Sequence, residues 1–131
     1  MFLLAGGAVS WSSKLQTCVA TSTAEAEYIA GAGAARTATW LRRLYSALMA
    51  EPLAPVLLYG DNKAMLHMAV NSADSARTKH VDVSYHYLRQ AVARGVVRTT
   101  YVSTDENVAD MFTKALAKVK VIKFRETAGM T

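Results

Sequence analysis

The sequence predicts an α/β domain, because short apolar runs of strand type alternate with segments of helical type. Residues 56–60 form an apolar run that ends in glycine, and Asp61 follows directly. Such a run between turn residues is typical of a buried strand. Residues 63–70 are mostly good helix formers, and the β-branched run at 96–103 predicts another strand. The central unit is therefore a strand, an acid and a helix.

The N-terminal region predicts a hairpin of two further strands. Residues 2–12 are expected to form one strand interrupted by a glycine pair, and residues 17–20 the other, after a turn at 12–14. Trp11 is expected to pack on a helix face, with an aromatic platform for a nucleic-acid base as the alternative. Cys18 is expected to be a small buried strand residue.

A long helix is predicted from the hydroxyl residues at 21–23 to about Met49. Glu27 heads its predicted inward face, where an acid is costly unless it is paired, protonated or bound to a metal. Glu25 lies two positions earlier, on the other side of the helix, and is expected to face water. The predicted inward face comprises Glu27, Ala30, Ala34, Ala38, Leu41, Leu44, Tyr45 and Leu48.

Asp61 ends the predicted strand at 56–60 and begins the helix at 63–70. One interpretation is that its side chain caps the helix. The other is that it binds a ligand, because the carboxyl ends of strands form the ligand crevice of open α/β sheets. Only the convergence of other acids at this point distinguishes the two.

A polar loop at 71–80 and a third helix that ends at Gly95 are predicted next. Asp82 and His86 are four residues apart on this helix and are either a metal-binding pair or a helix cap with a solvated histidine. Two ligands fall short of a structural zinc site. The apolar face of the helix comprises Val81, Tyr85, Leu88 and Val92.

Two helices are predicted at the C-terminal end. The first follows a cap at 104–107 and runs from Val108 to about Leu116, and the second is a basic helix at about 118–128. In the first of these helices the periodicity places Asp110 opposite the buried face. That buried face comprises Val108, Met111, Phe112, Ala115 and Val119.

The chain has a net charge of +5 and a pI of about 9.5, which favours an anionic partner such as nucleic acid. Its basic residues cluster near the C-terminus and on the long helix, as solvated surface or as phosphate-binding surface. The length fits a single domain, 1–131. A lone cysteine fits a reducing compartment, cytoplasmic or nuclear. The apolar start resembles neither a signal peptide nor a membrane span, so no membrane contact is expected.

Several blocks of the sequence occur in the order and spacing of a known family. They are residues 6–16 (GGAVSWSSKLQ), 22–28 (STAEAEY), 61–62 (DN), 77–86 (RTKHVDVSYH) and 107–114 (NVADMFTK). With these blocks the chain resembles the ribonuclease H domain of copia-type retrotransposon polyproteins over nearly its whole length. The resemblance implies one ribonuclease H-like domain with a mixed sheet of five strands and helices on both sides.

The resemblance also implies a site of four carboxylates that bind two divalent metal ions, Mg²⁺ or Mn²⁺. The activity that it implies is cleavage of the RNA strand of an RNA:DNA hybrid. By position, three of them are Glu27, Asp61 and Asp110. Two such ions activate water and stabilise the leaving oxygen, and Mg²⁺ prefers oxygen ligands. The residues expected to contact the nucleic acid are Arg42, Arg43, Asn62, Arg77, Lys79 and His80.

Two features depart from the family. Its first strand, which lies in the middle of the sheet and carries the first catalytic aspartate, should precede Phe2, and no aspartate occurs before Asp61. The loop at 103–106 also lacks the histidine of many ribonucleases H. We therefore expect a sheet without its central strand, and weak or absent cleavage. The alternative function is a non-catalytic remnant that binds nucleic acid or a protein, such as the polyprotein's reverse transcriptase or a second copy.

Overall fold

The computed structural model describes residues 1–71 and 83–130. The chain divides into two compact units, Met1–Val19 with Ser103–Thr131, and Ala20–Val102. The fold is α/β, as predicted, and its helices and two small sheets are consistent with a ribonuclease H-like fold. In chain order the elements are β1 (Phe2–Leu4), β2 (Gly7–Ser10), α1 (Thr23–Met49), β3 (Val56–Gly60), α2 (Lys63–Val70), α3 (Val83–Ala93), β4 (Val97–Tyr101), the 3-10 helix η2 (Val108–Phe112) and α4 (Lys118–Thr127).

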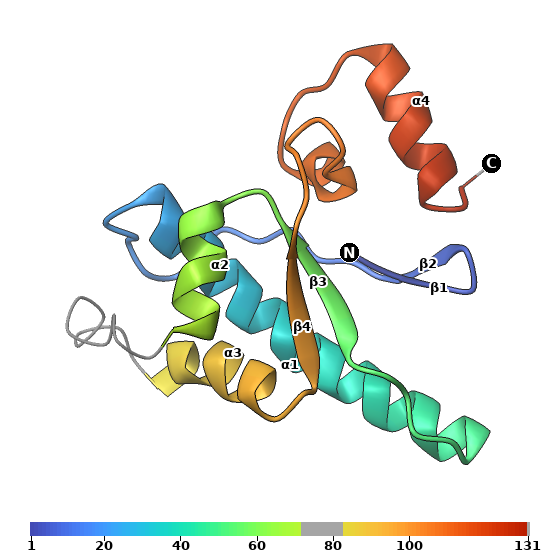
Figure 1. The fold of residues 1–131 in the computed structure, drawn as a ribbon. Coiled ribbons are helices and arrows are strands. Elements are labelled where there is room, and N and C mark those ends of the chain that lie inside the picture. Colours follow the sequence, from blue (N-terminus) through green and yellow to red (C-terminus); the bar gives the residue numbers. More distant parts are fainter. Residues whose placement is uncertain (72–82, 131) are drawn as a thin grey trace. The chain divides into compact units, whose positions relative to one another are not determined.

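In the larger unit, three helices pack around a pair of parallel strands. Strand β3 pairs with β4 from Val56 opposite Val97 to Gly60 opposite Tyr101. Helices α1, α2 and α3 contact one another and this strand pair (Figure 1). The backbone N–H of Val102 also donates to the carbonyl of Gly60 at 3.0 Å, which holds the carboxyl ends of the two strands together.

Helix α1 begins and ends where the sequence predicts. The side chain of Ser22 accepts a hydrogen bond from the N–H of Glu25 and so caps the helix, which runs for 27 residues to Met49. Glu25 does not simply face water, because it is half-buried and accepts a hydrogen bond from the backbone N–H of Thr21 at 2.6 Å.

The predicted inward face of α1 is only partly correct, because Ala38 is buried but other predicted members are exposed. Ala30 is exposed, Leu44 is 40% exposed and Leu48 is 72% exposed. The buried face lies about a residue further around the helix and carries mostly small side chains. It comprises Tyr28, Ala32, Ala35 and Ala38.

Small residues are buried here because α3 lies close against α1. A Cβ atom on Gly31 would lie 3.1 Å from Cδ2 of Leu88, and the hydroxyl of Tyr87 donates to Oγ1 of Thr39 at 2.9 Å. Alanine and glycine allow two helices to approach closely, and hydropathy alone does not reveal that contact.

In the smaller unit, β1 and β2 form an antiparallel hairpin with Leu4 opposite Gly7. The prediction of strands at 2–12 and 17–20 is therefore wrong, since the chain reverses at Ala5 and Gly6 and residues 17–20 form no strand. Both turn residues have positive φ, 51° and 82°, as a two-residue hairpin turn of the primed type requires.

Two predictions for single residues in the following segment are also wrong. Trp11 is 64% exposed and does not pack on a helix face, and Cys18 is exposed. Both lie in the irregular segment after β2.

The C-terminal part of the smaller unit agrees with the prediction at α4 but not at η2. The helix predicted to run from Val108 to Leu116 is a 3-10 helix that ends at Phe112, and Val119 is 80% exposed. Helix α4 occupies the predicted range and is followed by Gly129 with a φ of 71°. The backbone N–H of Ala8 donates to the carbonyl of Ala128 at 3.0 Å, so the hairpin is bonded to the end of α4.

The strand pairing differs from the five-stranded sheet that the resemblance implies. The described residues contain two separate sheets of two strands, β1–β2 and β3–β4. Within the described ranges β4 is the only strand that pairs with β3, so the other edge of β3 has no strand partner.

Part of the predicted structure lies outside the described residues, namely the loop at 71–80 beyond Asn71, and Val81 and Asp82 of the third helix. Leu88 is buried in α3, and Gly95 follows this helix with a φ of 63°, as predicted. In the parts of the chain that the structure describes, no helix is long and apolar enough to cross a membrane.

Candidate functional site

Glu27 lies in the second turn of α1 and is half-buried. Its neighbour Glu25 is used at the start of the helix, where Thr21 donates to Glu25 Oε2 through both its backbone N–H and its hydroxyl. The two acids therefore differ in role. Glu25 closes the helix terminus, as an acid in the first turn commonly does, whereas Glu27 lies beyond the groups that need capping.

Asp61 directly follows β3, and the prediction that it caps α2 is wrong. The cap is Asn62, whose Oδ1 accepts the N–H of Met65 at 3.1 Å. Asp61 is half-buried at the carboxyl end of the strand pair. Because Asn62 satisfies the helix terminus, the capping interpretation no longer explains why an acid stands at position 61.

The packing of α1 on α2 brings the segments that carry these two acids together. A Cβ atom on Gly31, one turn after Glu27, would lie 3.8 Å from the sulfur of Met65, which is one turn after Asp61. Both acids thus belong to the part of the larger unit where α1, α2 and the end of β3 meet.

Asp110 belongs to the smaller unit and is only 5% exposed. The expectation that it points away from the buried face is wrong, because the 3-10 geometry of η2 turns it inward. Its Oδ2 lies 2.8 Å from Nζ of Lys114, and its Oδ1 accepts a hydrogen bond from Nδ2 of Asn107 at 3.2 Å. A buried carboxylate requires such partners, since an unpaired buried charge is strongly unfavourable.

Lys114 was not among the residues singled out from the sequence as partners of an acid. Its spacing of four residues from Asp110 is the signal that could have found it, because residues four apart can meet on one face of a helical segment. In η2 the contact forms where the chain leaves the 3-10 helix, since the backbone N–H of Lys114 also donates to the carbonyl of Asp110 at 2.9 Å.

The three carboxylates have the chemistry that Mg²⁺ or Mn²⁺ requires, since both are hard cations that prefer oxygen ligands. Two of them are on segments of the larger unit that pack together, and the third belongs to the smaller unit. Among the described residues, no group of three or more His, Cys, Asp or Glu side chains is gathered closely enough to hold a metal ion. The three carboxylates are therefore chemically suitable ligands for these ions. The structure places Glu27 and Asp61 in the larger unit and Asp110 in the smaller unit.

The two arginines of α1 that were predicted to bind nucleic acid have different surroundings. The guanidinium of Arg42 donates to the carbonyls of Leu53 at 2.9 Å and Gly95 at 3.4 Å. Arg43 is exposed. Both line a pocket of about 350 Å³ together with Thr39 and Ser46. Arg43 is therefore the more exposed of the pair. Arg77, Lys79 and His80 lie outside the described residues.

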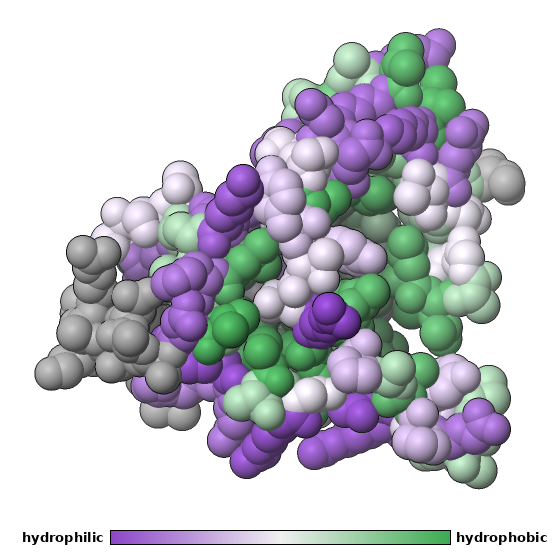
Figure 2. All heavy atoms as spheres, in the orientation of Figure 1, coloured by the Kyte–Doolittle hydropathy of each residue, from purple (hydrophilic) through white to green (hydrophobic). Residues whose placement is uncertain are grey.

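The basic surface of the smaller unit is partly neutralised by its own acids. Lys120 lies 3.1 Å from Asp105, and Lys123 lies 2.7 Å from Glu106. Figure 2 shows hydrophilic and apolar side chains next to each other over α4, where Val119 is 80% exposed. Surface ion pairs of this kind contribute little to stability. The Lys123 side chain is 54% exposed and that of Lys120 is 26% exposed, so Lys123 is the more accessible of the two to a phosphate.

Comparison with known proteins identifies homologues along nearly the whole chain. It is 42% identical over 130 residues to the Retrovirus-related Pol polyprotein from transposon TNT 1-94 of Nicotiana tabacum, a match that covers 99% of this chain and 10% of the polyprotein. The Retrovirus-related Pol polyproteins from transposons RE1 and RE2 of Arabidopsis thaliana are 33% and 34% identical over 94% and 93% of this chain, and 8% of each polyprotein. The homologues of this chain are retrotransposon Pol polyproteins.

The chain spans about a tenth of the length of these Pol polyproteins. The match to the tobacco Pol polyprotein covers 130 residues, so Glu27, Asp61 and Asp110 all lie in the Pol-like segment. No family model matches the chain, and no solved structure matches it.

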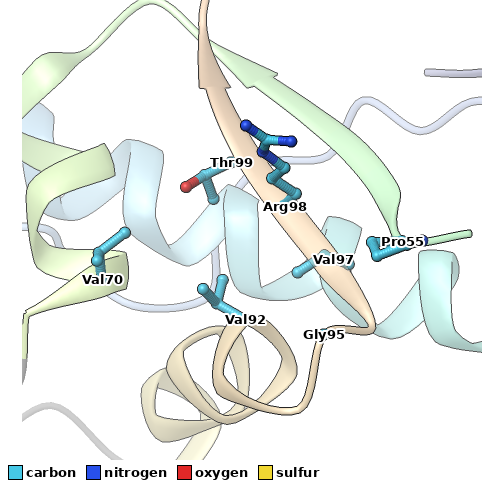
Figure 3. A pocket seen from close by; sticks show the side chains of 7 residues that line it. All are labelled: Pro55, Val70, Val92, Gly95, Val97, Arg98 and Thr99. Atoms are coloured by element: carbon cyan, nitrogen blue, oxygen red, sulfur yellow. The ribbon is translucent and has the colours of Figure 1, made fainter.

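A second pocket of this Pol-like chain lies away from the acids and has a different character. It has a volume of about 380 Å³ and is bounded mainly by apolar side chains. In Figure 3, Val70 from the end of α2 and Val92 from α3 point toward Thr99 of β4. None of the described residues that line it is a carboxylate, and neither Glu27 nor Asp61 is among them. The lining residues are Pro55, Val70, Val92, Gly95, Val97, Arg98 and Thr99.

Proposed function

We propose that this chain is the ribonuclease H-like part of a retrotransposon Pol polyprotein, a metal-dependent endonuclease that cuts the RNA strand of RNA:DNA hybrids. The observation that carries the proposal is that Glu27 and Asp61 stand on segments that pack together, with Asp61 at the carboxyl end of a parallel strand pair. This is where α/β proteins place their ligands. The Pol polyprotein homologues support the retroelement origin.

In this proposal Glu27, Asp61 and Asp110 would hold two divalent ions, Mg²⁺ or Mn²⁺. Such ions supply an activated water and charge stabilisation at the leaving oxygen of the phosphodiester. The chain's own contribution is positioning: Asn62 fixes the start of α2 beside Asp61, and the strand pair fixes the backbone before it. Arg43, with Arg77, Lys79 and His80, would bind the phosphates of the hybrid, whose shape and 2′-hydroxyls mark the RNA strand.

Cleavage by the 131-residue chain is expected to be weak, because no aspartate precedes Asp61 to supply a fourth carboxylate. Phosphoryl chemistry depends on positioning, and a displacement of about 1 Å can cost on the order of a hundredfold in rate. The open edge of β3 is where a further strand could pair and bring such a residue.

The test is cleavage of a labelled RNA:DNA hybrid with and without Mg²⁺. We compare the 131-residue chain with a version extended at its N-terminus by a strand that ends in aspartate. The extended chain should cleave, and Asp61→Asn in it should abolish cleavage, whereas Asp105→Asn, which changes the same charge on the surface, should not. Cleavage by the extended chain that survives Asp61→Asn would contradict the proposed active site.

A second function, non-catalytic binding of nucleic acid, is favoured by one observation. Both carboxylate oxygens of Asp110 have partners within the smaller unit, Asn107 and Lys114. Binding of the hybrid would then occur without chemistry, through the basic residues, and contacts to reverse transcriptase or to a second copy would use the same scaffold.

Salt dependence tests the binding itself. The logarithm of the affinity for a hybrid should fall linearly with the logarithm of the salt concentration, by about 0.9 for each phosphate neutralised. Arg43→Gln should lower this slope by about one contact. Affinity that does not change with salt would remove the electrostatic basis of both functions.

A further inference from the structure

The carboxylate of Asp110 is held by an internal cation. Asp110 is 5% exposed, and the ammonium of Lys114 lies 2.8 Å from its Oδ2. Asn107 occupies the other oxygen at 3.2 Å. A charge-assisted hydrogen bond of this length is strong, and in a buried setting it keeps the carboxylate in one orientation.

The two partners of this ion pair differ in their freedom to move. The side chain of Asp110 is 7% exposed, whereas that of Lys114 is 50% exposed. The backbone of Lys114 is fixed, because its N–H donates to the carbonyl of Asp110 at 2.9 Å. The ammonium, on its flexible four-carbon stem, can therefore leave Oδ2 for solvent without moving the backbone that holds Asp110.

We propose that Lys114 is a positioning residue that controls metal binding at Asp110. Its ammonium occupies the carboxylate oxygen that a divalent ion would bind, so that ion must displace it. The inference rests on the proposed function, in which Asp110 is a metal ligand, and adds a residue that sets the affinity of that ligand. A divalent ion and the ammonium of Lys114 compete for Oδ2. The measured affinity for the ion is therefore the intrinsic affinity multiplied by the fraction of molecules in which Asp110 is not paired with Lys114.

Removal of the lysine charge tests this competition. Mn²⁺ binding to the 131-residue chain is measured by calorimetry and by the electron paramagnetic resonance signal of the free ion. Lys114→Met keeps the length of the side chain and removes the ammonium, and it should tighten Mn²⁺ binding by about tenfold or more, since a positive charge adjacent to the ion is removed. Lys118→Met is the matched control, because it changes the net charge equally from an exposed position. It should change the affinity by less than about threefold, as screened surface charges do.

Asp110→Asn identifies the site that responds. In this background Lys114→Met should no longer change Mn²⁺ binding. If Mn²⁺ binding depends on Asp110 but is equal in wild type and Lys114→Met, the role of Lys114 is wrong and the proposed function stands. If no variant shows Mn²⁺ binding that depends on Asp110, the metal site itself is wrong and both proposals fall.

A second measurement, which keeps Lys114 in place, decides the matter even if Lys114→Met does not fold. The reactivity of each lysine toward an acylating reagent is measured by mass spectrometry with and without Mg²⁺. Saturating Mg²⁺ should release the Lys114 amine and raise its rate of acylation severalfold relative to Lys118, and Asp110→Asn should raise it without Mg²⁺. An unchanged Lys114 rate at a concentration that saturates Asp110 overturns the inference.

Discussion

The guanidinium of Arg42 donates to the backbone carbonyl of Gly95 at 3.4 Å, and so joins the C-terminal half of α1 to the turn before β4. Its Nε donates to the carbonyl of Leu53 at 2.9 Å, in the segment before β3. One side chain thus fixes the entry points of both parallel strands. The residue serves the fold that positions Asp61, in addition to any contact with phosphate.

Arg42→Met should therefore destabilise the larger unit. Hydrogen bonds from a charged donor to part-buried carbonyls contribute about 1.5–3 kcal/mol, so a loss of this order is expected. Urea unfolding is followed by the fluorescence of Trp40, which belongs to the same unit, in a Trp11→Phe background. The control is Arg43→Met, on the adjacent exposed position, which should change the stability by no more than about 0.5 kcal/mol. Equal losses in the two variants would contradict the role of Arg42.

Asn62→Ala should lower the free energy of unfolding by about 1 kcal/mol, because it removes the side-chain acceptor for the N–H of Met65. Asn62→Ser keeps an acceptor and should retain most of the stability. The measurement is the helical circular dichroism signal during thermal unfolding. An unchanged stability in Asn62→Ala would mean that Asn62 does not cap α2.

The burial of Tyr28 predicts that the protein loses stability at high pH. Burial raises the pKa of its hydroxyl above the ordinary value of 10.0, and the nearby Arg89 guanidinium lowers it by a smaller amount through its charge and a hydrogen bond. The unfolded chain therefore ionises first. The contribution of Tyr28 is fully present below pH 10 and is lost as the pH rises through the higher pKa of the folded state.

We expect the free energy of unfolding of wild type to fall above about pH 10, and to fall less steeply in Tyr28→Phe. Tyr59→Phe is the control, since Tyr59 is 59% exposed. This substitution should not change the slope of the free energy of unfolding against pH. Urea unfolding at several pH values provides the measurement, and identical slopes in wild type and Tyr28→Phe would rule out this linkage.

Gly129→Ala should destabilise the smaller unit. Gly129 has a φ of 71°, and an added Cβ would overlap the carbonyl oxygen of Gly6 and lie 2.9 Å from Cα of Gly7. The left-handed conformation alone costs about 1–2 kcal/mol for alanine. The reporter is Trp11 fluorescence in a Trp40→Phe background.

Gly33→Ala is the matched control for Gly129→Ala. Gly33 lies within α1, and a Cβ there would meet no heavy atom within 4 Å. The same substitution should stabilise the helix by about 0.5–1 kcal/mol, because glycine is the poorer helix former. The two variants must therefore change stability in opposite directions, and a gain in Gly129→Ala would show that its backbone can relax.

The local features of this protein were determined by the sequence itself. Helix α1 begins at the hydroxyl cap of Ser22, and Gly95 follows α3 with the positive φ that the sequence predicts. The strands β3 and β4 and the helix α4 lie where short apolar, β-branched and basic segments predict them. These features depend on interactions within a few residues, such as caps, turns and backbone propensity, which a sequence displays directly.

Only the tertiary structure decided which side of each element is buried. Small alanines, and not Leu44 or Leu48, are buried on α1, because close helix packing selects shape as well as hydropathy. Asp110 is buried despite its charge because Lys114 and Asn107 satisfy it. Such choices depend on partners that approach in space, and the energy of a buried charge or a close helix contact is set by those partners, which periodicity along one segment does not contain.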